Sequence, residues 1–198
     1  PLTLIALDNF ITSSEDVTFS NYKNVYFFQH DVILPYTHKI KYDFIIHAAG
    51  IASPNHYKAY PLKTIEVTID GTRNLLNVAK EHNSKFLYFS SSEIYGDPNI
   101  ENIPTHESYR GNVTCQGPRA CYDESKRMGE TLCYVYNTTK NLHTNIIRPF
   151  NIYGPGMNEN DYRVMPNFAN CIKGNKKLKV YGHGSQTRTF CYITDAMV

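Results

Sequence analysis

The protein has 198 residues, enough for one sizeable hydrophobic core or for one domain and part of a second. Its formal net charge is +2 and no stretch is strongly basic, which argues against a dedicated nucleic-acid binder. No apolar run approaches the roughly 20 residues that cross a bilayer, so we expect no membrane span. The five cysteines form no C-x-x-C pair and no metal-ligand spacing, which favours reduced thiols in a cytoplasmic protein.

Five short apolar runs predict β-strands, at residues 2–7, 25–28, 43–48, 86–92 and 144–150. None alternates polar and apolar residues, as expected for strands buried on both faces of a parallel sheet. Two long segments between them, residues 62–82 and 123–138, predict helices. Their apolar residues near helical spacing are Ile65, Ile69, Leu75, Leu76 and Val78 in the first and Met128, Leu132 and Val135 in the second. This alternation predicts an α/β fold with a doubly wound parallel sheet, whose ligands bind at the carboxyl ends of the strands.

After residue 151 the pattern changes to loops that contain Gly and Pro. These loops enclose one predicted short helix, residues 166–172, and two predicted strands, residues 178–181 and 189–193. We therefore expect residues 1–150 to form one domain and residues 151–198 to begin a smaller, substrate-binding domain. The chain starts at an apolar run without an initiator Met and ends inside a helix-like segment, which indicates a fragment of a longer protein.

The strongest chemical signal is a Tyr–Lys pair. Tyr122 and Lys126 are four residues apart, so they lie on one face of a helix. Such a pair is common and is usually only an exposed helix pair, but here it follows a strand that ends in three serines. A phenol has a pKa of about 10 and is a poor base at neutral pH, whereas a cation about 4 Å away stabilises the phenolate by about 4 kcal/mol. The spacing therefore predicts that Lys126, helped by a positive nicotinamide ring, lowers the pKa of Tyr122 and makes it a base.

A second signal lies at the end of the predicted strand 86–92. The Ser91 hydroxyl can hold a substrate oxygen beside Tyr122, and the Glu93 carboxylate two residues later can transfer a proton. The alternative is a Ser-rich turn without chemistry.

A third signal is Asp8, which closes the first apolar run. An acid at the end of the second strand of a dinucleotide-binding (Rossmann) fold accepts ribose hydroxyls and disfavours a 2′-phosphate, which predicts NAD rather than NADP. The alternative is an ordinary strand-end Asp. The Gly-rich phosphate loop that should precede Asp8 is absent from the sequence. We therefore expect residues 1–150 to be an NAD-binding Rossmann domain that lacks its first strand and Gly-rich loop.

Several motifs, in order and spacing, resemble those of UDP-glucuronate decarboxylases, which belong to the NAD-dependent epimerase/dehydratase family of extended short-chain dehydrogenases/reductases. They are D-N-F at 8–10, H-D-V at 30–32, the segment 90–98, G-P-R-A-C-Y-D-E-S-K-R at 117–127, R-P-F-N at 148–151, Y-G-P at 153–155, R-V at 163–164 and V-Y-G-H-G-S-Q-T-R at 180–188. The resemblance covers nearly the whole chain, and the runs at 117–127 and 182–188 are its most specific parts.

The resemblance implies a role for each site residue. Tyr122 would be the base, Lys126 its partner and ribose ligand, Ser91 the group that holds the sugar C4 oxygen, and Glu93 the group for the carbon-acid step. The NAD site would include Asp8, Asn9, Phe10, Asp31, Val32, Ala48, Ala49, Tyr122 and Lys126. The nucleotide-sugar site would include Asn151, Arg163 and Arg188.

The implied reaction begins when Tyr122 takes the C4 hydroxyl proton and NAD takes the C4 hydride. The 4-ketone is then β to the carboxylate, so CO₂ leaves. Reduction would give UDP-xylose, and earlier release would give the 4-keto-pentose. By the same resemblance we expect a nucleotide-sugar substrate and a homodimer formed through the two long helices.

Two other classes of function stay open. A 4,6-dehydratase of this family typically has Asp-Glu before the position of Ile94, where this chain has Ser92-Glu93, and a 4-epimerase typically lacks the carboxylate. A non-catalytic nucleotide-sugar-binding or dimerisation module is the third possibility. Four departures from the family pattern, at Ser13, Thr68, Ser91 and Pro149, bear on substrate choice rather than on the class of reaction.

Overall fold

The computed structural model describes residues 2–13, 22–37, 40–158, 161, 163–180 and 182–198. The elements in chain order are β1 (Leu4–Asp8), β2 (Val25–Gln29), β3 (Phe44–His47), α1 (Pro54–Ala59), α2 (Pro61–His82), β4 (Lys85–Phe89), the 3-10 helices η1 (Ser92–Tyr95) and η2 (Ile100–Asn102), α3 (Ala120–Lys140), β5 (Thr144–Ile147), β6 (Asn151–Tyr153), α4 (Val164–Lys173), β7 (Phe190–Tyr192) and α5 (Ile193–Ala196). Among the described residues, no helix combines the length and the apolar character needed to cross a membrane.

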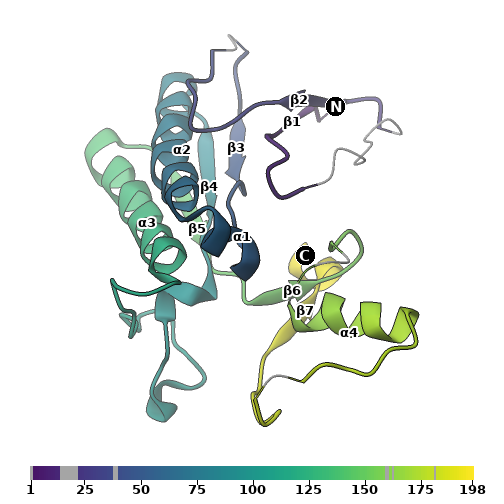
Figure 1. Ribbon diagram of the computed structural model, residues 1–198. Helices are drawn as coiled ribbons and strands as arrows, with labels where there is room; N and C mark the ends of the chain where they lie inside the picture. Colours follow the sequence, from purple (N-terminus) through teal and green to yellow (C-terminus); the bar gives the residue numbers. More distant parts are fainter. Residues whose placement is uncertain (1, 14–21, 38–39, 159–160, 162, 181) are drawn as a thin grey trace.

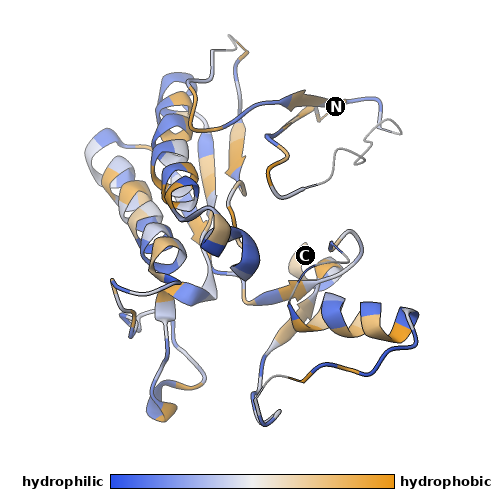
Figure 2. Cartoon of the chain, in the orientation of Figure 1, coloured by the Kyte–Doolittle hydropathy of each residue, from blue (hydrophilic) through white to orange (hydrophobic). Residues whose placement is uncertain are grey.

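The predicted α/β Rossmann-like fold with parallel strands is confirmed. All strand pairs are parallel, but they form three ladders, β1-β2, β3-β4-β5 and β6-β7, rather than one continuous sheet. Within the described residues, β1 and β3 each pair on one side only. Figure 1 shows α2 and α3 side by side against the β3-β4-β5 ladder, with β6, β7 and α4 grouped apart from them. Strands β2 and β3 are mainly hydrophobic (Figure 2). The prediction that they are buried on both faces is wrong for the described residues, since Phe28 is 42% and Phe44 64% exposed and His47 is the one buried residue of the two strands.

Local signals mark the start of α2 and the ends of both long helices. Pro61 occupies the first turn of α2, where its fixed φ suits the helix and its missing N–H is not needed. Each helix ends at an Asn in the left-handed conformation, Asn83 after α2 with φ 54° and Asn141 after α3 with φ 51°. Asn tolerates this conformation better than most residues do, so the sequence itself stops both helices.

The face that α3 buries differs from the apolar face that its sequence suggests. Of the three apolar residues in the predicted face, Leu132 packs against the core, but Met128 and Val135 are 46% and 41% exposed. The fully buried residues are instead Tyr122, Lys126, Gly129 and Cys133, among others. The physical reason is a close approach between α3 and β4, since a Cβ on Gly129 would lie 2.1 Å from the Tyr88 Oη. Small and reactive residues therefore face the sheet.

The second part of the chain confirms two of its three predicted elements. The predicted helix 166–172 is α4, and the predicted strand 189–193 contains β7. Residues 178–180 form no strand, and residue 181 lies outside the described residues. Lysines at 176, 177 and 179 keep this segment exposed, and no described strand pairs with it. Strand β7 pairs instead with β6, a three-residue strand within the expected start of the second domain.

Candidate active site

Three of the predicted catalytic side chains meet where β4 ends and α3 begins. Ser91 follows β4 and caps η1, where its Oγ accepts a hydrogen bond of 3.3 Å from the backbone N–H of Glu93. Tyr122 lies in the first turn of α3 and is buried, and its phenol shares a hydrogen bond with the Ser91 side chain. The structure therefore brings Ser91, Glu93 and Tyr122 together, although they are up to 31 residues apart in the sequence.

The pKa of the Tyr122 phenol is raised rather than lowered. Burial raises this pKa most, the hydrogen bond with Ser91 lowers it, and the nearby carboxylates of Glu93 and Asp123 raise it further. The sequence predicts that Lys126 lowers it, but the Lys126 Nζ donates a 2.6 Å hydrogen bond to the Phe89 carbonyl. The protein alone therefore holds the phenol protonated at neutral pH.

Lys126 is nevertheless placed as a buried charge beneath the site. Its Nζ lies 5.1 Å from the centre of the Tyr88 ring, and burial lowers its pKa to about 8. His47 is also buried, and burial and the charge of Lys126 lower its pKa to about 3. At neutral pH His47 is thus uncharged, with its Nε2 3.0 Å from the Thr72 hydroxyl, while Lys126 keeps most of its charge.

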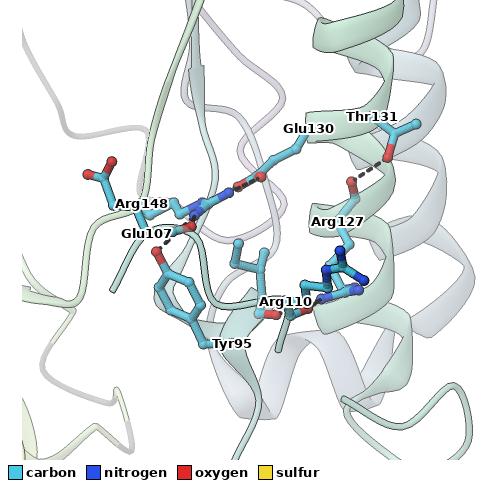
Figure 3. Close-up of polar contacts among 8 residues, drawn as sticks. Tyr95, Glu107, Arg110, Arg127, Glu130, Thr131 and Arg148 are labelled. Atoms are coloured by element: carbon cyan, nitrogen blue, oxygen red, sulfur yellow. Dashed lines mark hydrogen bonds and ion pairs between the residues drawn. The ribbon is translucent and has the colours of Figure 1, made fainter. Parts of the chain in front are cut away.

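Two arginines fix the segment that carries Glu93. Arg148, just after β5, pairs with Glu130 of α3 at 2.7 Å and donates a 2.9 Å hydrogen bond to the Tyr95 hydroxyl at the end of η1 (Figure 3). Arg127 of α3 donates hydrogen bonds of 2.9 and 2.8 Å to the carbonyls of Ile94 and Arg110. The turn after β4 is therefore held against α3 from both sides.

Arg119 and Tyr57 are site residues to which the sequence assigned no role. The Arg119 guanidinium forms an ion pair with Glu93 and reaches Asp123 Oδ2 at 3.4 Å. The four-residue spacing of Arg119 and Asp123 is a helix-pair signal that could have revealed one of these contacts. Tyr57 of α1 is buried, and its ring stacks on Tyr122 with the ring centres 5.4 Å apart. No local pattern marks Tyr57, because its partner is 65 residues away.

A cavity of about 230 Å³ lies at the carboxyl ends of β1, β2 and β3. Its lining includes five of the predicted cofactor residues, Asp8, Asn9, Val32, Ala48 and Ala49, together with Leu7, Ile11, Thr12, His30, Gly50, Ile51, Lys63 and Val67. A Cβ on Gly50 would lie 3.5 Å from the Lys126 Nζ, so the cavity adjoins the catalytic cluster. A ligand that extends from Asp8 can therefore reach the region of Tyr122.

Four predicted cofactor residues do not line this cavity: Tyr122 and Lys126, described above, and Phe10 and Asp31, which lie next to lining residues in the sequence. Phe10 has a φ of 59°, a strained conformation for a bulky residue, and its N–H donates a 2.8 Å hydrogen bond to Asp8 Oδ1. Asp31 accepts a 3.0 Å hydrogen bond from Asn9 and pairs with Lys63 of α2 at 2.9 Å. Burial raises the pKa of Asp31, but these partners outweigh burial and lower it. Asp31 is therefore ionised, and its ion pair with Lys63 links the loop that follows β2 to helix α2.

The predicted substrate residues come from the second part of the chain. Asn151 in β6 donates a 2.9 Å hydrogen bond to the Thr189 carbonyl, and the Arg163 guanidinium is paired with Asp161. Arg188 is exposed, but its charge lowers the pKa of Glu93, and that of Arg163 lowers the pKa of Tyr122. Both positive charges therefore act on the cluster of Ser91, Glu93 and Tyr122.

Comparisons with known proteins agree with this geometry. Residues 4–197 match the NAD dependent epimerase/dehydratase family. The chain is 43% identical over 195 residues to UDP-glucuronic acid decarboxylase 2 of Arabidopsis thaliana, covering 98% of this chain and 43% of that protein. It is 41% identical over 191 residues to UDP-glucuronic acid decarboxylase 1 of Xenopus tropicalis, covering 96% of this chain and 44% of that protein. The structure of UDP-glucuronic acid 4-epimerase from Bacillus cereus in complex with NAD superposes with a TM-score of 0.78 at 22% identity, covering 98% of this chain and 62% of that one, and shows the shared fold.

The fold is that of a dinucleotide-binding α/β protein, and the chain belongs to the NAD dependent epimerase/dehydratase family. Within this family it is similar to the UDP-glucuronic acid decarboxylases, of whose length it spans less than half.

Proposed function

We propose that the protein is an NAD-dependent decarboxylase of UDP-glucuronate that forms UDP-xylose or the 4-keto-pentose. The observation that carries this proposal is the cluster of Ser91, Glu93 and Tyr122 at the end of β4, with Ser92 at the position where a dehydratase of this family has its second acid. Similarity to decarboxylases at 41% and 43% identity supports the same choice. A dehydratase would need a second proton donor where Ser92 stands.

The residues around the cavity beside Asp8 suit the adenosine part of NAD. The Asp8 carboxylate would accept the ribose hydroxyls, the hydrophobic wall formed by Val32 and Ile51 would contact the adenine, and Gly50 leaves room next to Lys126. When bound, NAD would accept and return the C4 hydride and place a positive ring near the phenol. Lys126, held by the Phe89 carbonyl, would bind the cofactor ribose.

The protein's own residues would transfer the protons and bind the diphosphate. Ser91 would hold the C4 oxygen while Tyr122 takes its proton, which turns C4 into a ketone. Because this ketone is β to the carboxylate, CO₂ can leave without a second elimination step. Glu93 would then transfer the proton at C5. Arg188 and Arg163 offer planar forks that suit a diphosphate, with Asn151 beside them.

We also propose that residues 1–150 are an NAD-binding Rossmann domain without its first strand and Gly-rich loop, and that residues 151–198 begin the nucleotide-sugar domain. The open edges of β1 and β3 support this division, since one further parallel strand between them would join the two ladders. A structure of the full-length protein tests it, and an unpaired β1 or β3 edge there would contradict it.

A homodimer through α2 and α3 is the proposed assembly. Leu62 is 73% exposed on α2, and Met128 and Val135 are exposed on α3, which leaves apolar surface on both helices. A Val135→Glu variant should therefore be monomeric in light scattering where the wild type is dimeric.

We place the protein in the cytoplasm, a proposal supported by its five free thiols, and fluorescence microscopy of the tagged protein tests it.

The reaction is tested by product analysis of the full-length protein with NAD. We expect mass spectrometry to show CO₂ release and a UDP-pentose from UDP-glucuronate, and almost no product from UDP-glucose or dTDP-glucose. General acid catalysis is worth about 10²–10⁴ in rate, so Ser92 in place of the acid that a dehydratase has there should lower the rate of dehydration by about that factor. A 4-keto-6-deoxy sugar as the main product, without CO₂ release, would support the dehydratase instead.

A further inference from the structure

The Glu93 carboxylate shares one guanidinium with a second carboxylate. Arg119 forms an ion pair with Glu93 through its Nη2, and its Nε lies 3.4 Å from Asp123 Oδ2. The Asp123 side chain is only 11% exposed, and its Oδ1 has no hydrogen-bond partner among the described residues. A buried carboxylate with an unsatisfied oxygen depends on its remaining cation to stay ionised. Both carboxylates, of Glu93 and of Asp123, thus pair with the single guanidinium of Arg119.

The position of Arg119 makes these contacts informative. Arg119 is the N-cap residue of α3, and its side chain makes no cap hydrogen bond. The N-terminus of a helix carries a positive partial charge, so a cation there is unfavourable unless anions compensate for it. Asp123 supplies one anion from the first turn of α3, and Glu93 supplies the other from η1. The Arg119 carbonyl also accepts a 2.9 Å hydrogen bond from the N–H of Tyr122, which ties Arg119 to the turn that holds the proposed base.

We propose that Arg119 is a positioning residue that holds Glu93 ionised beside Tyr122, and that Asp123 anchors the guanidinium while Glu93 gains and loses its proton. This inference rests on the proposed function for the role of Glu93. The groups that face Glu93 are Arg119, Asp123 and Tyr122 from α3, Tyr57 from α1 and Arg188 from the segment before β7. Burial raises the pKa of Glu93 most, Arg119 and Arg188 lower it, and Asp123 raises it. Without Arg119, burial and Asp123 would raise this pKa further.

The direct test is to measure the pKa of Glu93 in the full-length protein by NMR titration of isotope-labelled glutamate. The carboxyl signal of Glu93 is identified as the one that disappears in Glu93→Gln. Arg119→Met should raise this pKa by about one unit, the low end for a lost opposite charge because the pair is half exposed. Arg119→Lys keeps the charge and should restore most of the difference. Asp123→Asn added to Arg119→Met should lower the pKa again, because it removes the like charge. Arg73→Met, in an exposed ion pair of α2, is the matched control and should leave the pKa unchanged.

The pH profile of CO₂ release separates this inference from the proposed function. If Glu93 transfers a proton in the reaction, the limb of the profile that it governs should move upward in Arg119→Met by the same amount as its pKa. A raised pKa with an unmoved profile would support the holding role of Arg119 and overturn the catalytic role of Glu93. An unchanged pKa in Arg119→Met, or an equal rise in Arg73→Met, would overturn the inference about Arg119.

Discussion

The two regions that carry the proposed site hold their functional side chains in opposite ways. At the junction of β4 and α3, Tyr122 and Lys126 are 6% and 5% exposed, and Tyr122 belongs to the hydrophobic core. In the second part of the chain, Arg163 and Arg188 are exposed, and their described hydrogen bonds go to the near neighbours Asp161 and Thr187. The proposed reacting groups are thus positioned by the packing that folds the protein, while the groups proposed to bind the nucleotide sugar lie outside this packing. Substitutions in the first region should change stability, and those in the second should change binding.

Gly129→Val should have the largest effect on the free energy of unfolding. A Cβ at this position would lie 2.1 Å from the Tyr88 Oη, so α3 would have to move away from β4. Overpacking of this kind costs about 1–3 kcal/mol, and we expect the upper end because the neighbour is buried in the core. Urea unfolding measures the change, with Met128→Val on the exposed face of α3 as the control. An equal loss in both variants would contradict the close approach of α3 to β4.

Lys126→Met should have a smaller effect of opposite sign. Burial lowers the pKa of Lys126 from 10.5 to about 8, so the unfolded state binds more protons than the folded state between these values. The wild type should therefore gain stability as the pH rises from about 8 to about 10.5. At neutral pH the lowering of this pKa from 10.5 to about 8 corresponds to a cost of about 3.4 kcal/mol for the buried charge, and the hydrogen bond to the Phe89 carbonyl offsets about 1.5 kcal/mol of it. The apolar Met should therefore stabilise the fold by on the order of 2 kcal/mol while abolishing turnover.

Unfolding of both proteins by urea, at neutral pH and near pH 10, measures this difference. The advantage of Lys126→Met should shrink as the wild-type lysine loses its proton. A variant that is less stable than the wild type at neutral pH would show that the hydrogen bond to the Phe89 carbonyl outweighs burial.

Arg188→Ala should have the smallest effect on stability, within about 0.5 kcal/mol, because the side chain is exposed and its described hydrogen bond is to the adjacent carbonyl. Its effect should appear in binding instead. Hydrogen bonds to charged groups are worth about 1.5–3 kcal/mol, which corresponds to a loss of UDP affinity of about 10- to 100-fold. Calorimetric titration with UDP measures it in the full-length protein, with Arg73→Ala as the control. Unchanged affinity would remove Arg188 from the substrate site.

The contrast between the regions also explains what the sequence could predict. Tyr122 and Lys126 could be predicted from the sequence because they are only four residues apart on one helix. Ser91 and Glu93 could be predicted because they follow a recognisable strand. The pairing of Glu93 with Arg119 spans 26 residues and depends on how η1 packs on α3, so no local pattern indicates it. The raised pKa of Tyr122 was missed for a related reason, since it depends on burial and on where the Lys126 ammonium points.

The buried face of α3 was equally hard to predict. Met128 and Val135 look like core residues, but the close packing at Gly129 places them on the outer face of α3. Strand β6 escaped prediction because it is only three residues long and is defined by its pairing with β7. Tertiary contacts, rather than local propensity, decide these features.

The most direct test of the account is hydride transfer in a single turnover. Full-length protein with bound NAD is mixed with UDP-glucuronate, and the absorbance of reduced nicotinamide is followed in the wild type and in Tyr122→Phe. The variant keeps the ring that stacks on Tyr57 and loses only the ionisable oxygen. We expect reduction to slow by about 10²–10⁴, with nearly unchanged affinity for the UDP-sugar. Loss of affinity equal to the loss of rate, or reduction at the wild-type rate, would contradict the assignment of Tyr122 as the base.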